Sequence, residues 1–428
     1  MNKPTITLLI GIFLSILIRI FFIINGSDVA DITKLHQMAE AILKGNNPYL
    51  LFNFASYPPI GLYMEAIILL LSNFLGIPFH MLTKILPNLA DVIITLVLYK
   101  FLIKHNVKPF SASLWGLIFI LNPISIIISS AHGQIDSITS LLVLLSIYIL
   151  ILNPTKFHRL LPSLLLGLAI AIKPNPAMLL PLFLVYRNWN FRQGILFLSI
   201  SLSPTIISLA PYIWQNPNAI IANVFSYSGV YDFSYAAILR GFWYQQNAQI
   251  WLPQAEQMLN LSKLAFILGT VFLLLFFVRS KNLPRSCLTI YLLFTGIYFG
   301  ISAQYLSWIL ALAILTREKM IIPFSIFGTV ALIGFYAFFG PEILFGKFWH
   351  GAAFQSKYML IYFIGNFLLW STVLWWFIKI IRSYIHTSFK TFSSLHRKIT
   401  LVSFIVFIIS LLPILQLAFD TINQSTNL

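Results

Sequence analysis

The sequence predicts an all-α, polytopic membrane protein, because it is apolar almost throughout and its apolar residues form long runs. Of its 428 residues, 59% are hydrophobic and 9% are charged, whereas soluble domains carry about 25% charged residues. The runs are about 17–25 residues long, a length that crosses the hydrocarbon core of a bilayer as a helix. This composition excludes a water-soluble enzyme and a protein whose partner is a nucleic acid.

Apolar runs recur along the chain and predict about 12 or 13 membrane crossings. No small-residue cleavage site follows the first run, 5–24, so we interpret it as a retained span and not as a signal peptide. Arg19 lies near the far end of this run, where its side chain is expected to snorkel to the interface. Pro174 and Pro176 interrupt the run 160–186, which predicts two half-helices there. The other expected spans are 59–75, 82–103, 111–130, 136–152, 195–214, 259–279, 286–301, 303–316, 320–340, 358–380 and 399–419.

The chain is strongly basic, with a formal net charge of +16. In a membrane protein such an excess first reflects cytoplasmic loops and contacts with anionic lipids; attraction of anionic substrates is the alternative. Lys3 places the N-terminus inside and the loop 25–58 outside, but the basic residues of 100–108 and 156–159 also favour the inside. Spans that simply alternate in direction cannot place all of these basic residues inside, so we expect one segment near 59–103 not to cross fully.

The single cysteine, Cys287, excludes an internal disulfide framework.

Two carboxylates, Asp28 and Asp31, directly follow the first span, although Asp and Glu together make up only 11 residues. Apolar residues recur at helical spacing over 29–44, which predicts a helix lying along the membrane interface. Asp28 is a natural N-cap for this helix, and Asp31 suits its first turn. A carboxylate at such an apolar boundary is expected to have a raised pKa, which would suit Asp31 to general-base catalysis.

Polar residues also occur between or within the later apolar runs. His132, Gln134 and Asp136 stand between two runs, a placement typical of a cavity or an aqueous pathway; they could bind a phosphate or sugar hydroxyls, or form a turn in which Asp136 caps the next helix. Lys173 lies beside Pro174 in a strongly apolar stretch, where a lysine is costly and a donor phosphate would be a suitable partner. Snorkelling is the alternative for Lys173.

Three further features are less specific. Asp91 and Glu65 lie within apolar runs, and we expect Asp91 to form helix-to-helix hydrogen bonds and neither residue to be catalytic. The segment 215–258 is polar and rich in aromatic residues, which usually anchor a protein at the interface. In the segment 302–308, the aromatic residues could belong to such a belt or contact a sugar or a lipid phosphate.

Together these features resemble the GT-C superfamily of integral-membrane glycosyltransferases, which use polyprenyl-phosphate sugars as donors. The first loop is similar to that of the first mannosyltransferase of GPI-anchor synthesis, although the acids are spaced Asp-x-x-Asp where the usual motif is Asp-x-Asp. The run 302–308 looks like the Ser-Gln-Tyr-x-x-Trp element of those enzymes, with Ala303 intervening. The residues that carry the first-loop resemblance are Asp28, Asp31, Gly45, Pro48, Tyr49, Tyr57, Pro58 and Pro59.

A second set of elements, 57–59, 132–137 and Lys173, resembles the dolichyl-phosphate-glucose-dependent transferases of N-glycan assembly. The resemblance therefore leaves mannose and glucose open. It implies a GT-C fold with a catalytic transmembrane module over 1–215 and a C-terminal transmembrane module over 216–428 that holds the loop 215–258.

The resemblance also implies roles for single residues. Asp31 takes the position of the catalytic acid of the loop motif, with Asp28 as its partner, and no metal is required, although a divalent metal would be possible. The implied reaction inverts the anomeric centre and passes a hexose from a polyprenyl-phosphate donor to a lipid- or glycan-linked acceptor among membrane lipids. The expected substrate-binding residues are Lys173, His132, Gln134, Asp136, Arg240, Tyr57, Gln304 and Tyr305.

Two other classes of protein share this composition. A transporter or flippase of a lipid-linked saccharide would commonly show broken helices in pairs, whereas the sequence shows a single break, near 174–176, and its acids cluster in the first outer loop. An accessory subunit without catalysis is the third interpretation. For the compartment, the compact chain favours a bacterial plasma membrane, with the endoplasmic reticulum as the alternative.

Overall fold

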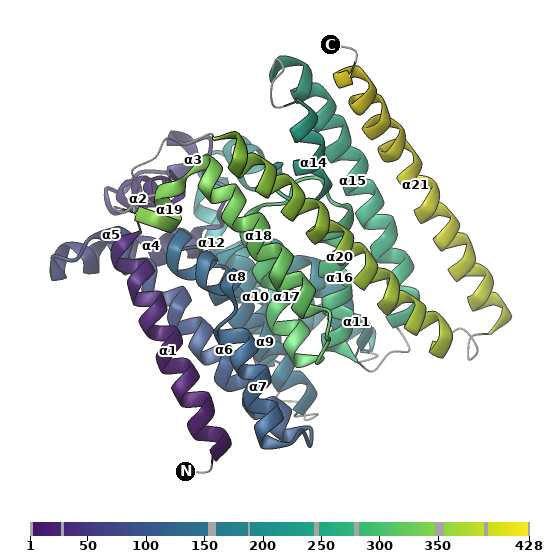
Figure 1. Ribbon diagram of the computed structural model, residues 1–428, viewed down its shortest axis with the longest axis horizontal. Helices are drawn as coiled ribbons and strands as arrows, with labels where there is room; N and C mark the ends of the chain where they lie inside the picture. Colours follow the sequence, from purple (N-terminus) through teal and green to yellow (C-terminus); the bar gives the residue numbers. More distant parts are fainter. Residues whose placement is uncertain are drawn as a thin grey trace.

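The computed structural model describes residues 3–26, 30–152, 160–186, 189–243, 248–277, 282–346, 355–388 and 393–426, and all regular structure in these ranges is helical (Figure 1). Seven helices are long and apolar enough to span a membrane, or eight if one bent pair is counted as a span. The predicted class, an all-α polytopic membrane protein, is thus confirmed. Six shorter apolar helices of 10–17 residues accompany them, so the number of 12 or 13 crossings stays a prediction.

The helices that carry the long spans and the shorter apolar helices together make up the bundle in Figure 1. The first group comprises α1 (Lys3–Asn25), α6 (Ile85–Lys104), α12 (Phe191–Gln215), α15 (Ala248–Phe277), α18 (Ile321–Phe339), α20 (Ser356–Ser388) and α21 (Ser394–Thr426). The second comprises α4 (Pro59–Leu75), α9 (Asp136–Leu152), α10 (Leu160–Ile172), α11 (Leu180–Tyr186), α16 (Leu283–Ile297) and α17 (Ser307–Leu315), the last preceded by the 3₁₀ turn η5 (Ala303–Leu306).

Several short elements gather at one end of the bundle, at the upper left of Figure 1. Among them are α2 (Ala30–Leu43), α3 (Pro48–Leu51), α5 (Phe79–Leu82) and α19 (Pro341–Phe345). The helix predicted over 29–44 is thus present as α2, and it packs against α4 through its apolar face. Ile32, Leu35 and Met38 are almost fully buried there, and burying a side chain of this size contributes about 1.5–3 kcal/mol. This packing fixes the position of Asp31 in the first turn of α2.

The expected span 111–130 is broken. It consists of α7 (Pro109–Ile120), α8 (Pro123–Ile126) and the π-helical turn η1 (Ile127–His132), with a bend of 42° at the junction. Pro123 starts α8 because its missing N–H costs nothing at the first helical position. The turn ends at Gly133, whose φ of +86° is readily accessible to glycine alone. The predicted break in 160–186 is confirmed: α10 ends at Ile172 and the short 3₁₀ turn η3 (Asn175–Leu179) leads into α11.

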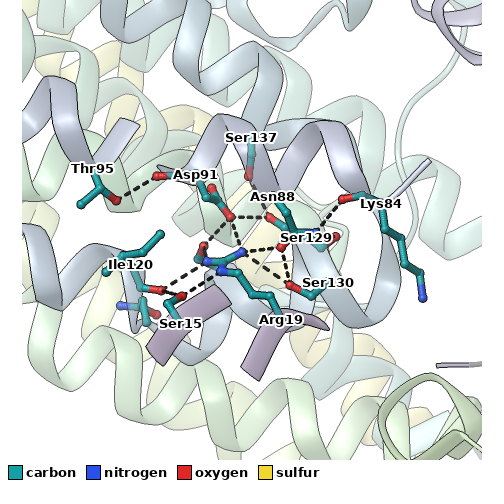
Figure 2. A network of polar contacts seen from close by, with 12 residues as sticks. Ser15, Arg19, Lys84, Asn88, Asp91, Thr95, Ile120, Ser129, Ser130 and Ser137 are labelled. Atoms are coloured by element: carbon teal, nitrogen blue, oxygen red, sulfur yellow. Dashed lines mark hydrogen bonds and ion pairs between the residues drawn. The ribbon is translucent and has the colours of Figure 1, made fainter. Parts of the chain in front are cut away.

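A buried polar cluster joins α1 to α6 and to the broken segment (Figure 2). Arg19 is 2% exposed, and its Nη1 lies 2.7 Å from Oδ2 of Asp91 and 2.9 Å from Oδ1 of Asn88. The hydroxyl groups of Ser125 and Ser129 also donate to Asp91, at 2.8 and 2.7 Å. The helix-to-helix bonding expected of Asp91 is confirmed. The expectation that Arg19 snorkels is wrong, because its charge is paired inside the bundle.

In the second half of the chain, helices occupy part of the segment 215–258, which the sequence analysis expected to be a polar loop. The polar segment expected over 215–258 contains α13 (Pro217–Ile220), the π turn η4 (Ile221–Phe225) and α14 (Ser234–Trp243), and its last part already belongs to α15. At the right of Figure 1, α21 packs along α15. The division into modules 1–215 and 216–428 stays a prediction.

Candidate active site

Two adjoining cavities lie where α2 meets the loops of the second half of the chain. The larger has a volume of about 500 Å³ and is lined by Asp31 and His132, among others. The smaller, of about 210 Å³, is lined by Lys173 and Tyr305. Four residues line both cavities, which places the two side by side: Ser56, Tyr57, Tyr227 and Gln304. Residues from both predicted modules therefore meet at one site.

Asp31 is the centre of a hydrogen-bonded group in the larger cavity. Its Oδ2 accepts a hydrogen bond from Nε2 of Gln134 at 3.0 Å and lies 3.3 Å from Nε2 of His132. Its Oδ1 is 3.8 Å from Nζ of Lys34. The side chain is 41% exposed, so the carboxylate is held on one side while the other faces the cavity. Asp31 was predicted as a site residue from the first loop, and His132 and Gln134 from a second motif; the structure brings the three together.

His132 is oriented by a residue that the sequence analysis missed. Oη of Tyr336, on α18, lies 2.6 Å from Nδ1 of His132, and the two rings meet edge to face. Tyr336 thus holds one ring nitrogen of His132, while the other, Nε2, faces Asp31. Tyr336 is buried in an otherwise apolar span; the available signal was that a buried tyrosine hydroxyl needs a partner.

The pKa of Asp31 differs from the expectation. Burial raises it, but the hydrogen bond and charge of His132, with the charges of Lys34 and Lys173, outweigh burial and lower the pKa to about 2. The predicted raised pKa is therefore wrong, because an apolar boundary alone does not account for the cations that tertiary packing brings to the carboxylate. Asp31 is ionised over the whole physiological range.

Lys173 and Asp136 form a buried ion pair behind the smaller cavity. Nζ of Lys173 lies 2.7 Å from Oδ2 of Asp136, and Nε1 of Trp308 donates to Oδ1 at 2.6 Å. Asp136 is fully buried and is not among the residues that line either cavity. Lys173 instead lines the smaller one, where Nζ also lies 5.6 Å from the ring centre of Tyr57 and 5.9 Å from that of Tyr305. Asp136 is thus placed to hold Lys173 and Trp308, and the structure gives it no cavity-facing position.

Asp232 is a second carboxylate in the larger cavity, and sequence reasoning gave it no role. Nη1 of Arg240 lies 2.8 Å from its Oδ1, and Tyr362 donates to its backbone carbonyl. Its pKa is raised, chiefly by burial, although Arg240 opposes this. Asp232 lies in an irregular segment between η4 and α14, where no periodicity indicates which way a side chain points. Arg240 lies behind Asp232 and lines neither cavity.

The loop that carries Tyr227 and Ser228 is held by a close backbone contact. A Cβ added to Gly229 would lie 2.1 Å from the carbonyl oxygen of Gly300, and Gly229 has a φ of +84°. Only glycine fits such an approach. Oη of Tyr298 also donates to the carbonyl of Ser228 at 3.0 Å. These contacts bring the loop beside η5, which carries Gln304 and Tyr305.

The remaining predicted residues are placed as follows. Tyr57 lines both cavities, and its Oη is 3.4 Å from Oε1 of Gln134. Gln304 lines both cavities. Asp28 lies outside the described residues, so its predicted role stays a prediction. Within the described ranges, no group of three or more His, Cys, Asp or Glu side chains could hold a metal ion; the expectation that no metal is required also stays a prediction.

A comparison with known proteins shows a partial similarity. The chain is 31% identical over 163 residues to GPI mannosyltransferase 1 of Candida albicans, an alignment that covers 37% of this chain and 37% of that protein. The chain therefore matches little more than a third of the length of this relative. No family model matches the chain. The partial similarity supports a glycosyltransferase-like function in a multi-pass membrane protein.

Proposed function

We propose that this protein is an inverting glycosyltransferase that moves a hexose, mannose or glucose, from a polyprenyl-phosphate donor to a lipid- or glycan-linked acceptor at the extracytoplasmic face of a membrane. The main support is the position of Asp31, an ionised carboxylate that His132 and Gln134 orient at the edge of a large cavity. The similarity to a mannosyltransferase supports the same class of reaction. The roles given below to single residues belong to this proposal.

In the proposed reaction, a hydroxyl oxygen of the acceptor attacks the anomeric carbon from the face opposite the phosphate. The new bond forms between these two atoms, while the bond from the anomeric carbon to the phosphate oxygen breaks and its electron pair leaves with the lipid phosphate. Asp31 takes the proton of the attacking hydroxyl. A carboxylate with a pKa of about 2 is a weak base, so we expect proton transfer to occur late, when the attacking oxygen has become acidic.

The negative charge that develops on the departing phosphate must be stabilised by donors already in place. Lys173 faces the smaller cavity and can contribute hydrogen bonds there. Tyr57 and Gln304 line both cavities and are placed to contact the sugar between them. Asp136 and Arg240 act behind the cavities, on Lys173 and Asp232. Alignment of donor and acceptor can lower the barrier by up to about 7–11 kcal/mol.

The compartment is also part of the proposal. The sequence analysis favoured a bacterial plasma membrane, and that stays a prediction. The matched relative is from a yeast, and this favours the endoplasmic reticulum as the compartment.

A transporter or flippase of a lipid-linked saccharide is the alternative, and one observation favours it. The sequence suggested a single broken helix, but the structure describes a second one, because 109–132 is bent by 42° between α7 and α8. The pair of Lys173 and Asp136 joins the break after α10 to the start of α9, the helix that follows the bent segment. Broken helices are common in transporters, so this alternative needs a direct test.

The first experiment uses purified protein in lipid nanodiscs, with short-chain polyprenyl-phosphate mannose and glucose and a native lipid extract as acceptor. Release of free polyprenyl phosphate together with label in a new product would establish the transferase and identify the sugar. Donor binding without transfer would indicate a missing acceptor or an accessory role. In sealed vesicles, movement of intact donor across the membrane without release of phosphate would establish the transporter and refute the proposal.

A further inference from the structure

The cations around the two cavities differ in whether an acid neutralises them. Lys173 is paired with Asp136, and Arg240 with Asp232, at N–O distances of 2.7 and 2.8 Å. Lys34 lies 3.8 Å from Asp31. A phosphate bound at any of these three would compete with a carboxylate that is already in place. Net positive charge for an anionic ligand must therefore come from another residue.

Lys263, on α15, supplies such a charge. Its Nζ donates to Oγ of Ser228 at 2.7 Å, and Ser228 lines the smaller cavity. Among the described residues, Lys263 has no carboxylate within ion-pair distance, although it is partly buried. Lys263 itself lines neither cavity; within the described part of the chain, its hydrogen-bond partner is the neutral hydroxyl of Ser228, which stands at the cavity wall.

The position of Lys263 along its helix makes this arrangement unusual. The sequence predicted a span over 259–279, which put Lys263 at the edge, where a lysine ordinarily snorkels. The structure begins α15 at Ala248, and the part of it that is long and apolar enough on average to span a membrane is Pro253–Phe277. Lys263 therefore lies within the span. A charged side chain within a span is costly and indicates a functional role. The ammonium group of Lys263 contacts Ser228 at the wall of the cavity, and not the lipid headgroup region.

We propose that Lys263 binds the phosphate of the lipid-linked donor, with Ser228 as the partner that its ammonium group leaves when the phosphate arrives. This inference rests on the proposed function, since it needs a phosphate-bearing substrate. The smaller cavity is also lined by Phe294, Met178 and Trp308, which suit the first carbons of a prenyl chain beside a charged phosphate. Lys173 then contributes hydrogen bonds at the same cavity, and Lys263 contributes the net charge.

The test measures binding of farnesyl phosphate and of farnesol, its uncharged counterpart, to the full chain in phosphatidylcholine nanodiscs. Lys263→Met should weaken farnesyl phosphate binding by about 10- to 100-fold, the loss expected for a charge-assisted hydrogen bond, and should leave farnesol binding unchanged. Lys263→Arg should retain most of the affinity.

The control variant is Lys379→Met, which removes an exposed lysine of another spanning helix, α20, and should leave both affinities unchanged. If Lys263→Met binds farnesyl phosphate as the unmodified protein does, the assignment of Lys263 is refuted while the proposed function stands. If the unmodified protein binds farnesyl phosphate no better than farnesol, the donor class is refuted as well. Adding phosphatidylglycerol distinguishes the source of the phosphate: equal competition by this lipid would show a headgroup site and overturn the donor assignment.

Discussion

Two polar clusters flank the same π-helical turn, and they differ in what their charges face. The closed cluster consists of Arg19, Asp91, Asn88 and the serine hydroxyl groups around them, and it meets η1 at Ser129 and Ser130. The open cluster consists of Asp31, His132 and Gln134, and it meets η1 at its end. In the closed cluster both ions are at most 2% exposed, whereas Asp31 is 41% exposed beside a cavity.

The difference distinguishes a cluster that stabilises the fold from a cluster that can take part in a reaction. A buried ion pair that is fully hydrogen-bonded has no atom left for a substrate, and removing one partner leaves an uncompensated charge. A carboxylate held on one side only keeps lone pairs that an acceptor hydroxyl can reach. We therefore expect substitutions in the open cluster to change turnover with little effect on stability, and substitutions in the closed cluster to do the reverse.

The largest expected effect is on turnover, from Asp31→Asn. Removing a general base typically costs 10²–10⁴-fold in rate, and the isosteric amide should leave the fold and donor binding largely intact. Release of polyprenyl phosphate in nanodiscs measures this. The matched control is Glu40→Gln, an acid on the same helix that forms an ion pair with Lys44 and lines neither cavity, and it should be fully active. Transfer by Asp31→Asn at the rate of the unmodified protein would show that Asp31 is not the base.

The next effect is on stability, from Asp91→Leu. Breaking a buried ion pair typically costs about 3–5 kcal/mol, because the Arg19 guanidinium is left without its counter-charge. The double variant Arg19→Met, Asp91→Leu should recover most of that loss. Unfolding in detergent, followed by circular dichroism, provides the measurement. A double variant no more stable than Asp91→Leu alone would show that the charges do not act as a pair.

A smaller effect is expected from Tyr336→Phe, which removes the hydroxyl beside Nδ1 of His132. Loss of one neutral hydrogen bond corresponds to about 1 kcal/mol, so transfer should fall by about fivefold. Tyr99→Phe is the control, since Tyr99 packs against the apolar group around Leu8, Ile12 and Ile120. If both variants transfer sugar equally well, His132 does not depend on Tyr336 for its orientation.

Several features of the two clusters could be predicted from the sequence, because their signals lie within short stretches of the chain. The periodicity of 29–44 predicted α2, and Pro174 and Pro176 predicted the break after α10. The order of the motifs placed Asp31, His132 and Lys173 at one site, and these residues do line the adjoining cavities. In each case the signal lay within a short stretch of chain, or in a resemblance to known proteins.

The features that failed depend on partners distant in the chain. Arg19 looked like a snorkelling residue because nothing near it in sequence indicates Asp91 at the same depth of the bundle. The low pKa of Asp31 comes chiefly from His132, which lies 101 positions further along the chain (132 − 31). Asp232 and Lys263 stood in segments where an interfacial residue is ordinary, and only their placement beside the cavities distinguishes them.

The smallest expected effect is that of pH on Asp31. Its pKa is lowered from 3.8 to about 2, so Asp31 stabilises the folded state fully above pH 3.8, and this contribution is lost as the pH falls toward 2. Between pH 5 and 8, protonation of Asp31 should therefore have no effect on transfer.

The difference in unfolding free energy between the unmodified protein and Asp31→Asn should stay constant above about pH 4 and change only below it. His132→Gln removes the main group that lowers this pKa, so the pKa of Asp31 in the folded state should return toward 3.8 and the change in that difference below pH 4 should become smaller. An acid limb of the transfer rate between pH 5 and 7 that persists in His132→Gln would contradict the assignment of Asp31 as the base, and Asp232, a buried carboxylate of the same cavity whose pKa is raised, would then be the better candidate.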